Sequence, residues 1–119
     1  MPIPYTVYHY TTLEKLGLIQ QENKLICSSR GEHGRGVYLT DLTLHNLQST
    51  LSDLLRVFDD KDREHIGSKL HSRVVIRTQA LINAGYELEH VDKGQYIVRK
   101  QIHLDDMPRN AWWYEDLYS

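Results

Sequence analysis

The polar and apolar positions near the start of the chain alternate as they do in a strand with one buried face. Residues 5–11 read Tyr-Thr-Val-Tyr-His-Tyr-Thr, with the period and the aromatic and β-branched content of a strand. Thr12 then has the character of a helix N-cap. We therefore predict a strand over 5–11 and a short helix that follows it and ends near Glu22. The predicted buried face of this helix consists of Leu13, Leu16, Leu18 and Ile19.

Two further short strands are predicted before residue 43. Residues 24–28 read Lys-Leu-Ile-Cys-Ser, and residues 37–42 read Val-Tyr-Leu-Thr-Asp-Leu. Between them the glycines at 31, 34 and 36 favour a flexible loop that runs directly into the later strand. Such a loop can let a ligand approach the backbone closely.

The middle of the chain carries the strongest helical pattern. Leucines at 44, 47, 51, 54 and 55 recur at helical spacing and predict a helix over 44–58. Residues 63–71 are predicted as a further helical turn or a loop. Residues 73–77, Arg-Val-Val-Ile-Arg, are typical of a buried strand, and residues 80–84 of a short helix or an irregular segment.

The last third is predicted to be mostly strand. Residues 87–91 and 95–104 could pair as a hairpin across the turn at 92–94, which reads Asp-Lys-Gly. The aromatic run Trp112-Trp113-Tyr114 is expected to dock on the body of the protein, or to form an interface, because exposed aromatic clusters are uncommon. The pattern as a whole predicts an α+β protein.

Length and composition limit the choice of function. A chain of 119 residues that is 40% hydrophobic can bury one modest core, so residues 1–119 are predicted to form one domain. The net charge of −2 argues against a general affinity for nucleic acid. A single cysteine, no signal-peptide pattern and no long apolar stretch lead us to expect a protein that acts in a cytoplasm and not in a membrane.

Several familiar kinds of site are disfavoured. The glycine spacing is not that of a dinucleotide-binding turn, and the element after it is a predicted strand instead of a helix. There is neither a His-Glu-x-x-His pattern nor a cysteine pair, so no metal site is expected. Cys27 is interpreted as a small buried apolar residue, and Asp105-Asp106 as a solvated turn before Pro108.

Two residues have both a structural and a functional interpretation. A lone histidine in a strand, His9, is more often structural than functional, and a tyrosine two residues after Gly36, Tyr38, is by default a core residue. The loop itself could be merely flexible, or its flanking Arg30 and Arg35 could contact a pyrophosphate.

Taken in order, His9-Tyr10-Thr11 and the stretch Gly34-Arg35-Gly36-Val37-Tyr38-Leu39-Thr40-Asp41 resemble two sequence signatures of ADP-ribosyltransferases. The likeness is to the poly(ADP-ribose)-polymerase and diphtheria-toxin class, and within it to small bacterial toxin domains. The resemblance implies a mostly antiparallel, split β-sheet with a few helices, and NAD as co-substrate without a metal. The NAD-binding residues implied in this way are His9, Tyr10, Thr11, Gly34, Arg35, Gly36 and Tyr38.

The same resemblance implies a catalytic set of His9, Tyr38 and Gln95. In the class a histidine binds a ribose of NAD, a tyrosine stacks on nicotinamide, and a late strand begins with glutamate in Glu-Tyr-Ile-Val. Here that stretch reads Gln95-Tyr96-Ile97-Val98, so glutamine stands at the glutamate position. Single transfer is therefore expected in preference to hydrolysis or chain elongation. Glu87, Glu89 or Asp41 could supply the missing charge.

The expected function is that of an NAD-dependent mono-ADP-ribosyltransferase, the toxin domain of a delivered bacterial effector or a stand-alone toxin. Its acceptor is expected to be a macromolecule, protein in preference to nucleic acid, and its producer is expected to carry a protective immunity protein. Two alternatives remain open. One is an RNA 2′-phosphotransferase relative, and the other is an inactive module that binds NAD or ADP-ribose.

Overall fold

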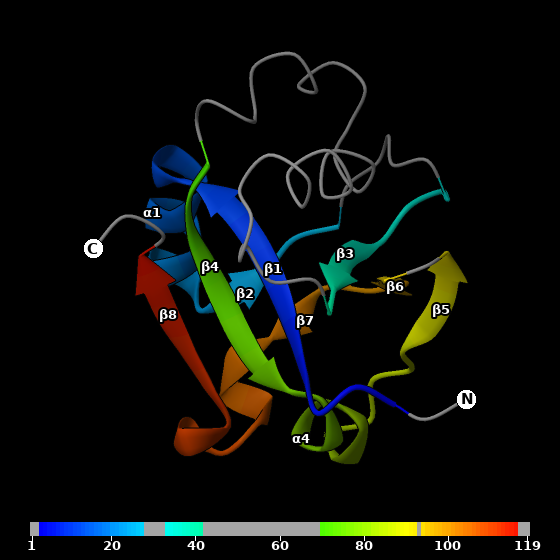
Figure 1. Ribbon diagram of the computed structural model, residues 1–119. Coiled ribbons are helices and arrows are strands. Elements are labelled where there is room, and N and C mark those ends of the chain that lie inside the picture. Colours follow the sequence, from blue (N-terminus) through cyan, green and yellow to red (C-terminus); the bar gives the residue numbers. More distant parts are fainter. Residues whose placement is uncertain (1–2, 28–32, 42–69, 93, 117–119) are drawn as a thin grey trace.

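The computed structural model describes residues 3–27, 33–41, 70–92 and 94–116 (Figure 1). Its main sheet consists of β1 (Thr6–Thr12), β3 (Val37–Thr40), β4 (Leu70–Arg77), β5 (Glu89–Asp92), β6 (Gln95–Val98) and β8 (Trp112–Asp116). These strands lie in the order β5-β6-β3-β1-β4-β8, and every neighbouring pair is antiparallel. The predicted α+β class is confirmed.

Short elements complete the fold. They are α1 (Leu13–Glu22), α4 (Thr78–Asn83), the 3-10 turns η2 (Leu104–Asp106) and η3 (Arg109–Ala111), and a second, two-stranded sheet of β2 (Lys24–Leu25) and β7 (Ile102–His103). In Figure 1 both β2 and β7 lie behind β1 and β4. None of the helices in the described ranges is both long and apolar enough to cross a membrane.

Helix α1 begins and ends as its sequence predicts. The Thr12 hydroxyl accepts a hydrogen bond from the Lys15 amide at 3.3 Å, and the helix stops at Asn23, which takes the left-handed conformation with φ 51°. Its predicted buried face was too wide, because Leu13 and Leu18 are 62% and 54% exposed. A helix turns about 100° per residue, so a helix of this length buries only one narrow stripe. That stripe is Leu16 and Ile19.

The core lies against one face of the main sheet. The apolar side chains on this face are Val7, Val37, Leu39, Val74, Ile76, Val98 and Trp112, and they pack with Ile19, Leu25, Leu81, Ile102 and Leu104 from the covering elements. A strand sends alternate side chains to opposite faces, so the other positions of the same strands form a second, more polar face. On that face Tyr38 and Ile97 form a small separate cluster.

Most other predicted elements are present with changed bounds. The strand predicted over 73–77 is longer, as β4, and the segment over 80–84 begins earlier, as the helix α4. The predicted hairpin is confirmed in β5 and β6, but its second strand ends at Val98, and β7 pairs with β2 instead. The predicted strands over 24–28 and 37–42 shrink to β2 and β3. The aromatic run docks as β8 beside β4. The helix predicted over 44–58 lies outside the described residues. The turn or loop predicted over 63–71 lies outside them as far as residue 69, and its last two residues belong to β4 instead.

Candidate functional site

His9 lies in the middle of β1 and reaches across to the backbone of β3. Its Nδ1 atom is 3.0 Å from the carbonyl oxygen of Tyr38. A carbonyl oxygen can only accept, so Nδ1 carries the proton and donates it, which leaves Nε2 as an acceptor. Burial lowers the pKa of His9 below its ordinary 6.5, although the bond to the Tyr38 carbonyl opposes the shift. His9 is therefore neutral near pH 7, with Nε2 able to accept a hydrogen bond.

The two edges of β1 are paired very differently. Toward β4 the pairing runs from Thr6 to Thr12, whereas toward β3 the described residues form one pair, Tyr8 with Thr40. Beyond that pair lie residues 9–11 of β1 and 37–38 of β3, which the bond from His9 to the Tyr38 carbonyl joins. We call these two segments the β1–β3 seam. The described strands of the main sheet form one continuous six-stranded sheet, so the split implied by the resemblance stays a prediction.

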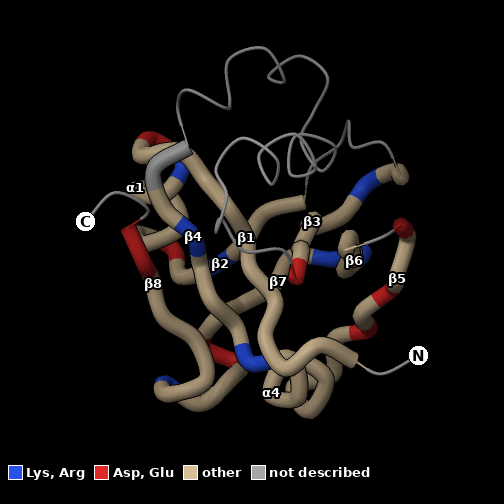
Figure 2. The backbone as a smooth tube through the Cα atoms, in the orientation of Figure 1, with Lys and Arg blue, Asp and Glu red and all other residues tan. Residues whose placement is uncertain are grey.

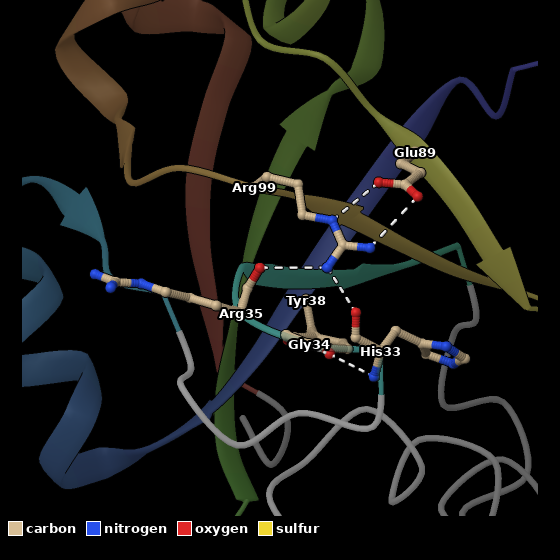
Figure 3. Close-up of polar contacts among 6 residues, drawn as sticks. All are labelled: His33, Gly34, Arg35, Tyr38, Glu89 and Arg99. Carbon is tan, nitrogen blue, oxygen red and sulfur yellow. Dashed lines mark hydrogen bonds and ion pairs between the residues drawn. The ribbon is translucent and has the colours of Figure 1, made fainter.

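Tyr38 is buried more deeply than expected for a residue that stacks on a ligand. It is 5% exposed, and its ring packs with Ile97 and Val91. Its hydroxyl donates to the carbonyl of Gly34 at 2.6 Å and accepts from the amide of His33 at 2.8 Å (Figure 3). This burial agrees with the default interpretation of Tyr38 as a core residue, and its hydroxyl holds residues 33 and 34 of the glycine loop together.

The two described glycines of the loop meet different structural demands. Gly34 has φ +94°, a backbone conformation that residues with a side chain rarely adopt. Gly36 touches β6 so closely that a Cβ atom there would lie 2.5 Å from Cγ1 of Ile97 and 2.8 Å from the carbonyl oxygen of Val98. Packing thus accounts for Gly36 without a ligand. Arg35 is exposed and points away from the rest of the loop cluster in Figure 3, while Arg30 lies outside the described residues.

Gln95 is the first residue of β6, opposite Thr40 of β3. It is 1% exposed, and its Oε1 atom has no hydrogen-bond partner among the described residues. The Thr11 hydroxyl oxygen, in the β1–β3 seam, is buried and unpartnered in the same way. Buried acceptors without partners are uncommon, and each calls for an explanation such as a ligand that donates hydrogen bonds.

The predicted site residues are neighbours in the sheet, although their side chains do not all share a face. Strand alternation places Tyr10, Tyr38 and Gln95 on the more polar face, and His9 and Thr11 on the other. His9 contacts the Tyr38 backbone, and the Tyr38 hydroxyl contacts the Gly34 carbonyl. The Tyr10 hydroxyl accepts instead from Arg73 of β4 at 3.1 Å.

The acidic residues considered as substitutes for a catalytic glutamate have other contacts. Glu89 pairs with Arg99, with Oε2 3.0 Å from Nε, and the hydrogen bond from Arg99 lowers the pKa of Glu89. Asp41 accepts from the Tyr96 hydroxyl at 3.3 Å. Glu87 is exposed. Sequence reasoning missed Arg99, although the hairpin register places it near Glu89 across the two strands.

A ligand-sized cavity lies away from this site. It has a volume of about 520 Å³ and lies between α4 and the β5–β6 hairpin, lined by Ile82, Tyr86, Leu88, His90 and Tyr96 among others. Neither His9, Tyr38 nor Gln95 lines it. We place the candidate site at the β1–β3 seam, because the oriented imidazole of His9 and the buried, unpartnered hydroxyl of Thr11 lie there, with Gln95 on β6, the strand next to β3.

The remaining sequence candidates have structural positions. Within the described ranges no three His, Cys, Asp or Glu side chains come together as metal ligands would. Cys27 is half-buried and packs against the core. Asp105 and Asp106 are exposed in η2, where Asp106 accepts from the Tyr86 hydroxyl at 2.8 Å. No protein-family model matches this chain, and no curated protein matches it either.

Proposed function

We propose that this protein is an NAD-dependent mono-ADP-ribosyltransferase whose site lies at the β1–β3 seam. The observation that carries the proposal is the orientation of His9. A neutral imidazole, fixed through Nδ1 by a backbone carbonyl, offers Nε2 as an acceptor to a hydroxyl group. A ribose hydroxyl of NAD is a donor of this kind, and the His-Tyr-Thr and glycine-tyrosine signatures support the same substrate.

The proposed reaction requires mainly that the protein hold NAD in position and stabilise the charge that develops on its ribose. Nicotinamide leaves C1 of its ribose through a state with oxocarbenium character, so the protein gains most by holding the dinucleotide and stabilising the developing charge. In the proposal, His9 Nε2 accepts from a ribose hydroxyl, and the Thr11 hydroxyl on the same face assists His9. Gln95 Oε1, on the opposite face of the sheet, accepts from a different hydroxyl of the substrates. The amides of the glycine loop approach the pyrophosphate, with Arg35 beside them.

Glutamine at position 95 favours a single transfer. An amide oxygen can accept the ribose hydroxyl but carries no negative charge, and the nearby carboxylate of Glu89 is paired with Arg99. We propose a macromolecular acceptor, protein in preference to nucleic acid given the net charge of −2. A toxin with this activity requires an immunity protein in the cell that makes it.

The proposal is tested by nicotinamide release from NAD, compared between the wild type, His9→Ala and His90→Ala. His90 is an exposed histidine of β5 and serves as the matched control. We expect His9→Ala to lower the rate at least about tenfold, with the circular dichroism spectrum unchanged, and His90→Ala to match the wild type. Equal rates in all three folded proteins would overturn the assignment of the site.

One alternative is favoured by a specific observation. The buried glutamine at 95 fits a module that binds NAD or ADP-ribose without cleaving it, because no carboxylate stands at that position. Nicotinamide release separates the two functions. NAD binding by calorimetry without release, together with harmless expression in a bacterial cytoplasm, would favour the binding module. Growth arrest that His9→Ala relieves would favour the transferase.

A further inference from the structure

Arg99 connects three separate segments of the chain. It directly follows β6, and its guanidinium pairs with Glu89 of β5, Nε to Oε2 at 3.0 Å. Through Nη1 it also donates to the carbonyl oxygen of His33 at 2.6 Å and, over a longer 3.4 Å, to that of Arg35 (Figure 3). Arg99 therefore ties residues 33–36, which we call the glycine loop, to the β5–β6 hairpin.

The glycine loop has a second anchor. The Tyr38 hydroxyl bonds to the amide of His33 and to the carbonyl of Gly34. Three successive carbonyl groups are thus engaged, those of His33 and Arg35 by Arg99 and that of Gly34 by Tyr38. The described peptide bonds are all trans, and the C=O and N–H of a trans peptide point in opposite directions. The Gly34 amide therefore points away from Arg99, and the Arg35 amide away from the Tyr38 hydroxyl.

The contacts of Arg99 determine geometry more than stability. The Arg99 and Glu89 side chains are 46% and 49% exposed, and ion pairs this exposed add little to the free energy of unfolding. The fit around them is nevertheless close, since a Cβ atom on Gly34 would lie 3.0 Å from Nη1 of Arg99. Glu89 neutralises the positive charge of Arg99. Arg99 therefore acts on the loop mainly through the hydrogen bonds that it donates to the His33 and Arg35 carbonyls.

We propose that Arg99, held by Glu89, is a positioning residue that orients the amides of the glycine loop for the pyrophosphate of NAD. The inference rests on the proposed function. Successive amides around a residue of positive φ form a concave site suited to phosphate oxygens. Arg99 touches only the far side of the loop backbone, so it acts on substrate binding and leaves the reacting ribose untouched.

The test compares wild type, Arg99→Gln, Arg99→Lys, Glu89→Gln and Lys100→Gln. Lys100 is the exposed neighbour of Arg99 and lies over the Tyr86 ring, so its variant removes the same charge without touching the loop. NAD affinity is measured by calorimetry, and kcat and KM by nicotinamide release. We expect Arg99→Gln to raise both Kd and KM about tenfold while kcat stays within about twofold. Arg99→Lys recovers part of the affinity, Glu89→Gln is intermediate, and Lys100→Gln equals wild type.

A second measurement needs no substrate. Hydrogen exchange at the His33 amide, which donates to the Tyr38 hydroxyl, is measured without NAD and is expected to be faster in Arg99→Gln than in wild type and Lys100→Gln. Unchanged exchange, or a loss of kcat with KM unchanged, would overturn the positioning role. If the wild type binds no NAD, the proposed function fails, and the exchange rates still decide whether Arg99 orders the loop.

Discussion

The two edges of strand β1 differ in the number of paired residues that the structure describes, and the candidate site lies at the edge with fewer pairs. On the β4 edge, pairing extends from Thr6 to Thr12, and the side chain of Arg73 contacts several neighbours. Arg73 there donates to Glu115 at 2.7 Å and to Tyr10 at 3.1 Å, and its guanidinium lies 4.5 Å from the centre of the Tyr8 ring. Figure 2 shows the same arrangement of charge, with basic positions on β4 and acidic ones at the end of β8.

On the β3 edge, the described residues form one pair, Tyr8 with Thr40. His9 reaches the neighbouring backbone in place of a ladder bond, and Thr11 keeps a buried hydroxyl without a described partner. Where a strand edge is fully paired, its backbone donors and acceptors already have hydrogen-bond partners. Where pairing is interrupted, polar groups remain that a ligand can hydrogen-bond. The difference locates the candidate site on the β3 side.

The largest expected effect tests whether β3 is held in place by packing. Gly36→Ala would force a Cβ atom against Ile97 and the backbone of Val98, so we expect a loss of about 2–3 kcal/mol in the free energy of unfolding. Gly17→Ala is the control, because nothing lies within 4 Å of a Cβ atom in that exposed position of α1. It should gain about 0.5–1 kcal/mol. Urea denaturation measures both, and equal midpoints would contradict the packing role of Gly36.

The Gln95→Met variant tests whether Gln95 serves substrate binding at a cost in the free energy of unfolding. Gln95→Met keeps the volume and removes the buried, unpartnered oxygen, so we expect stability to rise by about 1 kcal/mol. ADP-ribose transfer should fall about tenfold, because an acceptor for a ribose hydroxyl is lost. Thermal unfolding and a labelled-NAD assay give the two values. A variant that is less stable yet fully active would show that Gln95 has a purely structural role.

The Arg73→Lys variant tests whether the β4 edge contributes to stability and not to NAD cleavage. Arg73→Lys cannot keep the bonds to both Glu115 and Tyr10, because an ammonium group lacks the planar fork of a guanidinium. We expect a loss of about 1 kcal/mol in the free energy of unfolding and no change in NAD cleavage. Reduced cleavage in a folded variant would mean that the β4 edge contributes to the site.

The smallest effect concerns the pH dependence of stability. The pKa of His9 in the folded protein lies below its ordinary 6.5, so as pH falls below 6.5 the unfolded chain takes up the proton first. Stability is therefore full above pH 6.5 and declines toward the lower, folded-state pKa. His9→Gln should remove part of that decline, seen as a shallower plot of melting temperature against pH between 7 and 5. NAD cleavage by wild type should persist below pH 6.5 and fall only as pH passes through the lowered pKa of His9 in the folded protein, because protonated Nε2 cannot accept.

Local sequence determined much of this protein. Thr12 predicted where α1 begins, because a side-chain oxygen can satisfy a free amide of the first turn. The period-two pattern over residues 5–11 predicted β1, and the turn at 92–94 predicted the β5–β6 hairpin, since strand period and turn residues are properties of neighbouring positions. The glycines before Val37 predicted a flexible loop that enters β3, whereas the structure holds Gly34 at a positive φ and Gly36 in close contact with β6.

Contacts between distant residues were decided only by the tertiary structure. The burial of Tyr38 and the bond from His9 to its carbonyl depend on how β3 lies between β1 and β6. The bonds from Arg99 to the glycine loop join residues that are 64 and 66 positions apart. Side-chain periodicity describes one strand at a time, so it can state which residues share a face, but it cannot state where two strands stop pairing. The way in which β1 lies beside β3 brings His9 to the backbone of Tyr38, and it therefore decides where the candidate site is.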